Sequence, residues 1–213
     1  MKIEYLGHSC FKLTESAGLS VVCDPYPDEV GYKMPLVKAD AVTVSHHHFD
    51  HDCTDKVLNN PVVIDRAGSC NFHGVQIDAI NSFHDDVHGK KRGENLIVKF
   101  VMDGITVCHL GDLGEPCSEE LTDKISPVNV LLIPVGGNYT IDAKTAKEYV
   151  EKIKPQIVIP MHYRAEGCKI DIAKIDEFLK LFDDDCIYND DCLNLSIKDL
   201  DTAKTKIIVL RRA

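Results

Sequence analysis

One polar stretch of the chain, Ser45-His46-His47-His48-Phe49-Asp50-His51-Asp52, carries most of the information about fold and chemistry. It follows directly on the apolar run 41–44, which predicts a short strand that ends at the histidines. Side chains two residues apart in an extended chain point to the same side, so His46 and His48 are expected to face one point. Asp50 and His51 follow the bend. Imidazoles and a carboxylate suit Zn²⁺, Mn²⁺ or Fe²⁺, so the stretch predicts a metal site at a strand end.

Three more potential ligands stand where predicted strands end. They are His84 after 75–83, Asp112 after 105–110 and His162 after 156–161. Active sites gather at the carboxyl ends of strands in α/β proteins, although each of these residues taken alone fits a structural role as well. Together with the histidine stretch they make five His and two Asp, which is too many for one four-coordinate ion and suits two ions. His88 is an alternative to His84, because both lie in the loop after the same strand.

The remaining pattern predicts an α/β (α+β) protein of one domain spanning residues 1-213. The first half alternates apolar and polar residues as strands do, and Asp103-Gly104 predicts a hairpin between 95–102 and 105–108. Apolar residues at helical spacing predict amphipathic helices over 142–153, with Asp142 as N-cap, and over 170–182. About twelve strands with three or more helices suggest two sheets packed face to face and covered by helices.

The composition limits the partners. The chain has 34 acidic and 24 basic residues and a formal charge of −10, which disfavours nucleic acids and anionic membranes as partners and leaves a small-molecule substrate. We see no signal peptide at the start and no apolar stretch long enough to span a bilayer, so a cytoplasmic location is expected. The nine cysteines include no C-x-x-C pair, which favours free thiols in a reducing compartment.

These motifs resemble those of the metallo-β-lactamase superfamily of metal-dependent hydrolases, and most of all those of its small members related to ascorbate-phosphate lactonases. The family's H-x-H-x-D-H motif fits residues 46–51, and its later ligands fit His84, Asp112 and His162. The glycine-rich segment 134–137 and the opening segment 6–9 are also similar to this subgroup. The resemblance implies a four-layer αββα sandwich with the metals at one edge of the two sheets.

The resemblance also implies a ligand set for two divalent ions. The implied groups are His46, His48 and His84 for the first ion, Asp50, His51 and His162 for the second, and Asp112 as the bridge. Zn²⁺ is the first choice for both ions, with Mn²⁺ or Fe²⁺ as alternatives. The implied chemistry is attack by a hydroxide, held between the two metals, on an ester, lactone or phosphoester bond of a small metabolite, either anionic or neutral. Asp50 would orient the hydroxide and deliver a proton to the leaving group.

Further residues are candidates for roles around the metals. Asp24 ends the predicted strand 19–24 and can accept a hydrogen bond from a ligand imidazole, with a turn residue as the alternative. His8 and His109 either line the site or satisfy hydrogen bonds in the core. Three basic residues are candidate contacts for an anionic group of the substrate, with a solvated loop as the alternative for the first two: Lys91, Arg92 and Arg164.

Three other functions compete with a small-molecule hydrolase. A nuclease or phosphodiesterase of the same superfamily would need a basic face, and a flavodiiron-type oxidoreductase would carry a glutamate where His48 stands. A non-catalytic metal-binding protein that keeps the fold is the third alternative, because a fold does not fix a function.

Overall fold

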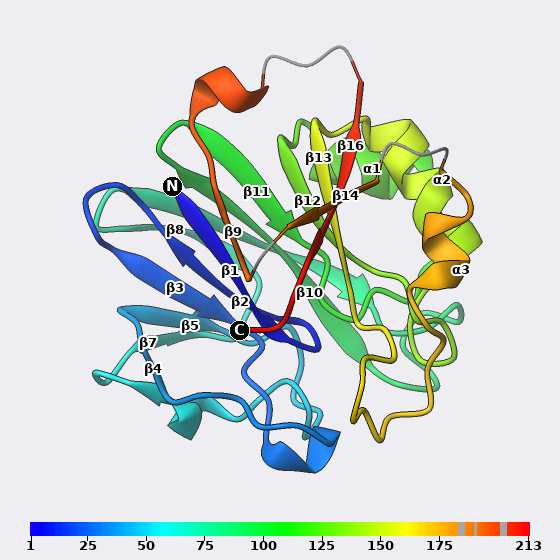
Figure 1. The fold of residues 1–213 in the computed structure, drawn as a ribbon, viewed down its shortest axis with the longest axis horizontal. Coiled ribbons are helices and arrows are strands. Elements are labelled where there is room, and N and C mark those ends of the chain that lie inside the picture. The colour runs from blue at the N-terminus through cyan, green and yellow to red at the C-terminus, as the bar shows by residue number, and fades with distance from the viewer. Residues whose placement is uncertain (183–185, 190, 201–203) are drawn as a thin grey trace.

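Two facing β-sheets form the centre of the molecule, whose computed structural model describes residues 1–182, 186–189, 191–200 and 204–213 (Figure 1). The six-stranded sheet contains, in spatial order, β15 (Cys192–Asn194), β1 (Lys2–Gly7), β2 (Cys10–Thr14), β3 (Ser20–Cys23), β5 (Ala41–Thr43) and β7 (Val62–Ile64). The chain runs antiparallel from β15 to β3, and β3, β5 and β7 are parallel. The histidine stretch therefore follows a strand inside this sheet, as predicted.

The eight-stranded sheet carries the other predicted ligands. Its spatial order is β14 (Cys186–Asn189), β16 (Lys206–Leu210), β13 (Ile157–Met161), β12 (Val130–Pro134), β11 (Ile105–His109), β10 (Glu94–Met102), β9 (Val75–Phe83) and β8 (Gly68–Phe72). The predicted hairpin is present, with Asp103 and Gly104 both at positive φ between β10 and β11. Because β9, β11 and β13 all point the same way, their carboxyl ends lie at one edge.

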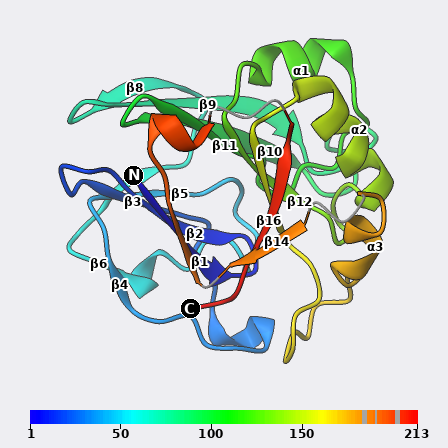
Figure 2. The same cartoon turned by 45° about the horizontal axis from the view of Figure 1, so that its top comes forward.

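Apolar side chains fill the space between the two sheets and cover the outer face of the larger one. Phe11, Leu13, Phe100 and Leu132 are among the fully buried residues of the central layer. On the outer face of the eight-stranded sheet lie α1 (Glu119–Ile125), α2 (Ala143–Ile153) and α3 (Asp176–Leu179), which gather at one side of the molecule (Figures 1 and 2). The predicted helix over 142–153 is confirmed, since the Asp142 side chain accepts a hydrogen bond from the amide of Thr145.

Among the described residues, short turns and irregular chain, in place of α-helices, cover the outer face of the six-stranded sheet. This cover consists of irregular chain, two 3₁₀ turns and a two-stranded sheet: η1 (Asp28–Val30), η2 (Thr54–Lys56), β4 (Val37–Lys38) and β6 (Val57–Leu58). Buried Tyr26, Val30 and Met34 pack there against Val22 and Val42. The expected sandwich is thus present, with α-helices on the larger sheet and short turns on the smaller one. A further 3₁₀ turn, η3 (Ile197–Leu200), precedes β16.

The predicted helix over 170–182 is wrong for its first half. Only Asp176–Leu179 is α-helical. Ala173 donates its amide to the carbonyl of Gly136 and accepts the amide of Arg164, so its backbone groups are used by neighbouring loops. The apolar periodicity remains real as a packing signal, because Ile172 and Phe178 are buried. Tertiary hydrogen bonds replaced the helix without changing which side chains face inward.

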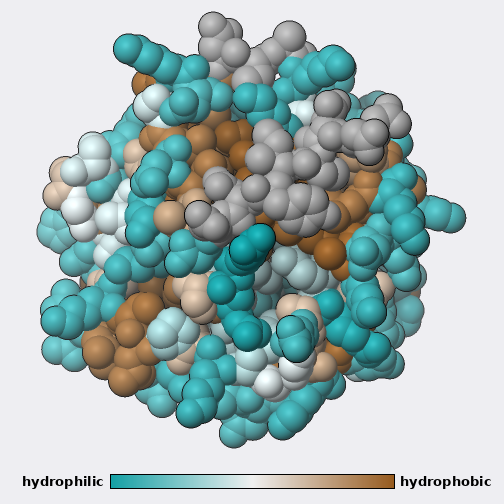
Figure 3. All heavy atoms as spheres, in the orientation of Figure 1, coloured by the Kyte–Doolittle hydropathy of each residue, from teal (hydrophilic) through white to brown (hydrophobic). Residues whose placement is uncertain are grey.

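The described residues form no membrane-spanning helix. None of the helices formed by these parts of the chain is long and apolar enough to cross a bilayer. Figure 3 shows hydrophilic residues surrounding separate hydrophobic areas on one face of the molecule.

Candidate metal centre

The predicted ligands come together at one edge of the sandwich. The six-stranded sheet contributes the loop after β5, with His46, Asp50 and His51 buried and His48 exposed. The eight-stranded sheet contributes buried side chains from the ends of β9, β11 and β13: His84, Asp112 and His162. Strand direction therefore explains how residues more than one hundred positions apart in the sequence meet.

Asp112 lies at the centre of this group. Its Oδ2 atom lies close to the Nε2 atoms of three histidines: 3.2 Å from His51, 3.3 Å from His84 and 3.2 Å from His162. The Nε2 atom of His46 is 3.9 Å away. Ligand atoms around a tetrahedral ion at 2.0–2.1 Å are roughly 3.3 Å apart. The spacing of these side chains is therefore the spacing of atoms that share a metal ion.

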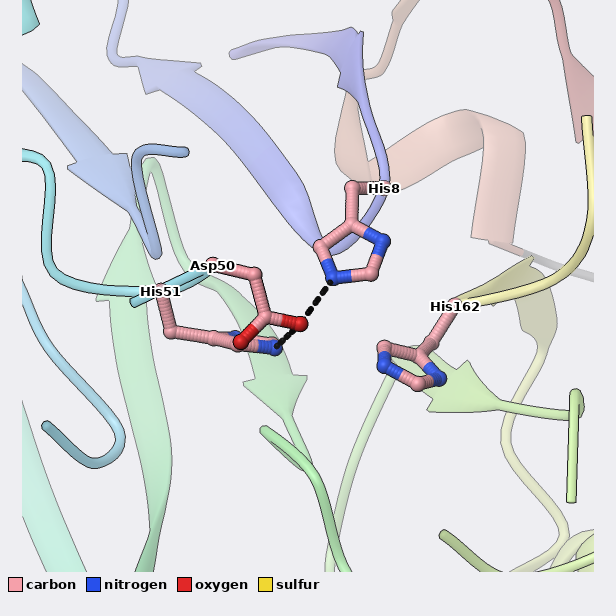
Figure 4. A group of neighbouring side chains, drawn as sticks. All are labelled: His8, Asp50, His51 and His162. Carbon is pink, nitrogen blue, oxygen red and sulfur yellow. Dashed lines mark hydrogen bonds and ion pairs between the residues drawn. The ribbon is translucent and has the colours of Figure 1, made fainter. Parts of the chain in front are cut away.

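The histidines and Asp50 form two groups that both approach Asp112, and a third group of Asp24, His46 and His51 links them. In each group the potential ligand atoms lie within 4.8 Å of one another, and the groups are His46, His48 and His84, and His8, Asp50, His51 and His162. Figure 4 shows the second group, in which dashed lines join the Asp50 carboxylate to His8 and His51 and the His162 ring lies to one side. The division is the one implied by the family resemblance, with His8 as an additional member of the second group.

Hydrogen bonds fix which nitrogen of two imidazoles faces the centre. His51 Nδ1 donates to Asp24 Oδ2 at 2.9 Å, and Ser45 Oγ donates to the same oxygen at 2.6 Å. Because the Ser45 hydroxyl uses its proton on Asp24, it accepts a hydrogen bond from His46 Nδ1 at 2.9 Å. Both rings then present Nε2 lone pairs to the centre, as metal-binding histidines do when an outer partner holds their other nitrogen. The predicted role of Asp24 agrees with this arrangement, and the role of Ser45 was not predicted.

Buried polar atoms at the centre lack partners within the described parts of the chain. These atoms are His46 Nε2, His51 Nε2 and Asp112 Oδ1. A buried polar atom without a hydrogen bond costs about 1–3 kcal/mol, so a cluster of three is costly unless something else binds there. Since the set consists of imidazole nitrogens and a carboxylate oxygen, divalent metal ions fit it.

The electrostatics favour the protonation states that bind metals. Burial, followed by the neighbouring His51, lowers the pKa of His46 to about 3, which keeps its ring neutral at pH 7. Burial alone would raise the pKa of Asp112, but the imidazoles of His162 and His51 hold it well below its usual range. Burial also opposes a charge on His51, yet the surrounding carboxylates, Asp112 first, raise its pKa. The carboxylates thus attract positive charge to the centre. A metal cation can supply that charge in place of the proton on His51.

Comparison with known proteins also indicates metal binding. The sequence profile of the "Beta-lactamase superfamily domain" matches residues 2–162. The chain belongs to the metallo-β-lactamase superfamily. Its similarity to a "UPF0173 metal-dependent hydrolase" of Carboxydothermus hydrogenoformans is 33% identity over 76% of this chain and 84% of that protein. These findings make it a metal-dependent hydrolase of the superfamily.

Solved structures agree on the fold. A Thermotoga maritima protein assigned to the superfamily as a Zn-dependent hydrolase is 38% identical, with a TM-score of 0.81 over 98% of this chain and 97% of that one. The isothiocyanate hydrolase from Delia radicum gut bacteria is 12% identical with a TM-score of 0.69, covering 100% and 97% of the two chains. At that identity the second likeness shows the fold alone.

His88 and His109 lie outside the two groups of candidate ligands. His84 joins the ligand group, whereas its alternative His88 is exposed and packs its ring against Phe83 at 5.4 Å. His109 Nε2 donates to the carbonyl of Ser9 at 2.8 Å, and its Nδ1 accepts the amide of Gly111. His109 therefore supports the turn before Asp112 and lies outside both ligand groups.

Asn95 supports the same turn and was not predicted. Its side-chain oxygen accepts the amide of Asp112 at 2.9 Å, and its amide nitrogen donates to the carbonyl of Leu110 at 3.0 Å. Gly111 between them has a φ of 55°, and a Cβ atom there would overlap Asn95 and Ser45. The available sequence signal was one polar residue at the head of the apolar run 95–102.

A cavity of about 520 Å³ opens over the ligands. Besides ligand side chains it is lined by Phe49, Lys91, Arg92, Tyr139, Lys169, Ile170 and Asp171. Lys91 and Arg92 thus lie where the prediction placed them. Arg164 lies outside the residues lining this cavity and pairs with Asp171 at 2.6 Å, so its predicted contact with substrate lacks support. Lys169 was not predicted, because it lies in a loop whose path the sequence does not reveal.

Proposed function

We propose that this protein is a two-metal hydrolase that cleaves an ester, lactone or phosphoester bond of a small metabolite. The observation that supports it most is the position of Asp112, whose Oδ2 atom lies within 3.3 Å of imidazoles from both ligand groups. A carboxylate in this position is suited to bridging two ions. Zn²⁺ is the first choice, and Mn²⁺ or Fe²⁺ also fit these ligands.

The proposed ligands follow the two groups. His46, His48 and His84 would hold one ion, Asp50, His51 and His162 the other, and Asp112 both. Two bound divalent ions lower the pKa of water towards about 7 and polarise an oxygen of the substrate. The nucleophile is thereby available at neutral pH without a separate strong base.

Asp50 is the proposed proton carrier. Its side chain lines the cavity, and its Oδ2 atom accepts a hydrogen bond from His8 Nε2 at 3.1 Å. Burial would raise the pKa of this carboxyl, but His51 and the hydrogen bond from His8 lower it below its usual range. Oδ2 accepts the hydrogen bond from His8 with one lone pair and would bind the ion with the other, which would leave Oδ1 to orient water and to pass a proton to the leaving group.

The charge balance favours a small molecule over a nucleic acid. The formal charge is −10, and the cavity has room for a small molecule. A nucleic-acid enzyme would need a basic surface that tracks many phosphates.

The test is a measurement of metal content and hydrolysis on protein purified without chelator. We expect about two divalent ions per chain and hydrolysis of at least one compound in a screen of esters, lactones and phosphodiesters. Asp112→Ala should lose both ions and at least about a hundredfold in turnover, because even outer partners of metal ligands are worth 10–100-fold. The matched control is His88→Ala, which removes an exposed histidine of the same region and should change neither quantity. Full turnover in Asp112→Ala would overturn the two-metal mechanism, and ions without hydrolysis of any compound would favour the non-catalytic alternative.

A further inference from the structure

Three cations line the cavity over the candidate metal ligands. They are Lys91, Arg92 and Lys169, which belong to two loops far apart in the sequence. We propose that they form a subsite for a carboxylate or phosphate group of the substrate, set apart from the bond that is cleaved. The proposal extends the hydrolase function proposed above, but its test does not depend on turnover.

The charges around the cavity are unbalanced in favour of an anion. Apart from the ligand carboxylates, Asp171 is the one acidic residue among the described residues that line it. Asp171 pairs with Arg164 at 2.6 Å, so these two charges together add nothing to the net charge around the cavity. Lys91 pairs with Asp86 at 2.9 Å, but both side chains are more than half exposed, and such pairs are worth only about 0–1 kcal/mol. In a chain of charge −10, these three cations line the same cavity as His48, His84 and His162.

Two contacts hold the Arg92 guanidinium in place but use few of its hydrogen-bond donors. One NH2 group donates to the carbonyl of Asn138 at 3.0 Å, and the guanidinium carbon lies 5.4 Å from the centre of the Tyr139 ring. Arginine has five N–H donors, so most remain available for a planar anion. An arginine fixed in this way loses little side-chain entropy on binding, which favours recognition of a carboxylate or phosphate.

The loop that carries two of the cations is organised by one buried carboxylate. Asp85, next to His84, accepts hydrogen bonds from the amides of Lys91 at 2.7 Å and Arg92 at 2.8 Å. It also accepts the amides of Val87 and Gly89. Because one side chain ties the loop to the residue beside a metal ligand, the cations are held at a fixed offset from the metal centre. A solvated loop would not require such a buried centre.

The rest of the lining limits the kind of molecule that fits. Phe49 is 59% exposed and lies beside the ligands, and Ile170 lines the same cavity. An exposed aromatic ring at a cavity offers contact to the apolar part of a ligand. The substrate class is therefore a small organic anion. Its carboxylate or phosphate would lie beside Lys91, Arg92 and Lys169, and its ester or lactone bond would lie over the metals.

The test measures binding of three probe molecules to the protein as purified, by titration calorimetry. The probes are phenylphosphate, benzoate and the uncharged benzamide. Charge-assisted hydrogen bonds are strong, so the double variant Arg92→Gln/Lys169→Gln should bind the anions at least about tenfold more weakly. Binding of benzamide should not change. Comparison of phenylphosphate with benzoate tells which anionic group the subsite prefers.

The matched control is Lys90→Gln/Lys174→Gln, which removes the same charge from exposed residues that do not line the cavity. It should bind all three probes as the wild type does. Equal anion affinity in Arg92→Gln/Lys169→Gln and wild type would overturn the subsite, since the anions would then bind the metals alone. A loss shared by the control, or no anion binding to the wild type, would also overturn it. Metal content and hydrolysis of the same samples report separately on the proposed function.

Discussion

The two ligand groups differ in how firmly the protein holds them. The group of His8, Asp50, His51 and His162 is buried throughout, whereas the group of His46, His48 and His84 includes the exposed His48. The buried group also has more support. His8 contributes its side chain to Asp50 and its carbonyl oxygen to the amide of His162 at 2.9 Å, and Asp24 holds His51.

This difference suggests unequal affinities at one centre. A preorganised, buried set of ligands loses less entropy and faces less competition from water than a set with an exposed member. We therefore expect a tightly held ion in the buried group and a more readily exchanged ion in the open group.

The largest effect should appear when ions are removed stepwise. We expect a chelator titration to remove two ions in two phases, with dissociation constants at least about tenfold apart. This factor is expected because residues that support metal ligands change metal affinity by about 10–100-fold. His48→Ala should lose the weaker phase and keep the other, whereas His51→Ala should lose the tight phase. A single phase for both ions, or loss of the tight phase in His48→Ala, would contradict the comparison.

A smaller effect is expected from His8. Its φ is 55°, a conformation that asparagine tolerates, so His8→Asn should keep the backbone while its shorter side chain no longer reaches Asp50. We expect the tight ion to bind about 10-fold more weakly, in keeping with the loss of an outer partner. The open ion should be unaffected. His73→Asn, at an exposed residue with a φ of 50°, is the control and should leave both affinities unchanged. Unchanged affinity for both ions in His8→Asn would show that His8 is a core residue only.

The smallest effect concerns Asp85 and acid stability. Burial opposes its charge, but the amides led by that of Arg92 lower its pKa to about 2, below the ordinary value of about 3.9. A carboxyl with a lowered pKa in the folded state adds stability above its unfolded pKa and loses it as the pH falls towards 2. Asp85→Asn should therefore lower the melting temperature at pH 6, and the gap to wild type should shrink between pH 4 and pH 2. A gap that stays constant over this range would contradict the proposed role of the charge.

Sequence alone predicted which candidate ligands come together better than it predicted their surroundings. The ligands follow strands whose period and ends are visible in the apolar pattern, so His46, His84, Asp112 and His162 could be placed at one edge. The supporting roles of Asn95 and Ser45 depend on the exact path of turns around Gly111, which no periodicity encodes. The rim of the cavity was predicted least well, since Lys169 was missed.

The fold shows the same limit. The hairpin at Asp103-Gly104 and the helix beginning after Asp142 have local signals in turn and capping residues, and both are confirmed. The expected helix over 170–182 was apolar at the right spacing, but hydrogen bonds between Ala173, Gly136 and Arg164 replaced its first half. Gly136 is distant in the sequence and Arg164 precedes the apolar pattern, so helix propensity could not have revealed either partner.

The central claim, that Asp112 joins two ions in one centre, is tested most directly by electron paramagnetic resonance of the protein loaded with Mn²⁺. At two ions per chain, ions about 3.5–4 Å apart should give a spin-coupled spectrum. Asp112→Ala should lose that spectrum, and His88→Ala should keep it. Saturation at one ion, or two ions with the spectra of isolated Mn²⁺, would contradict the account.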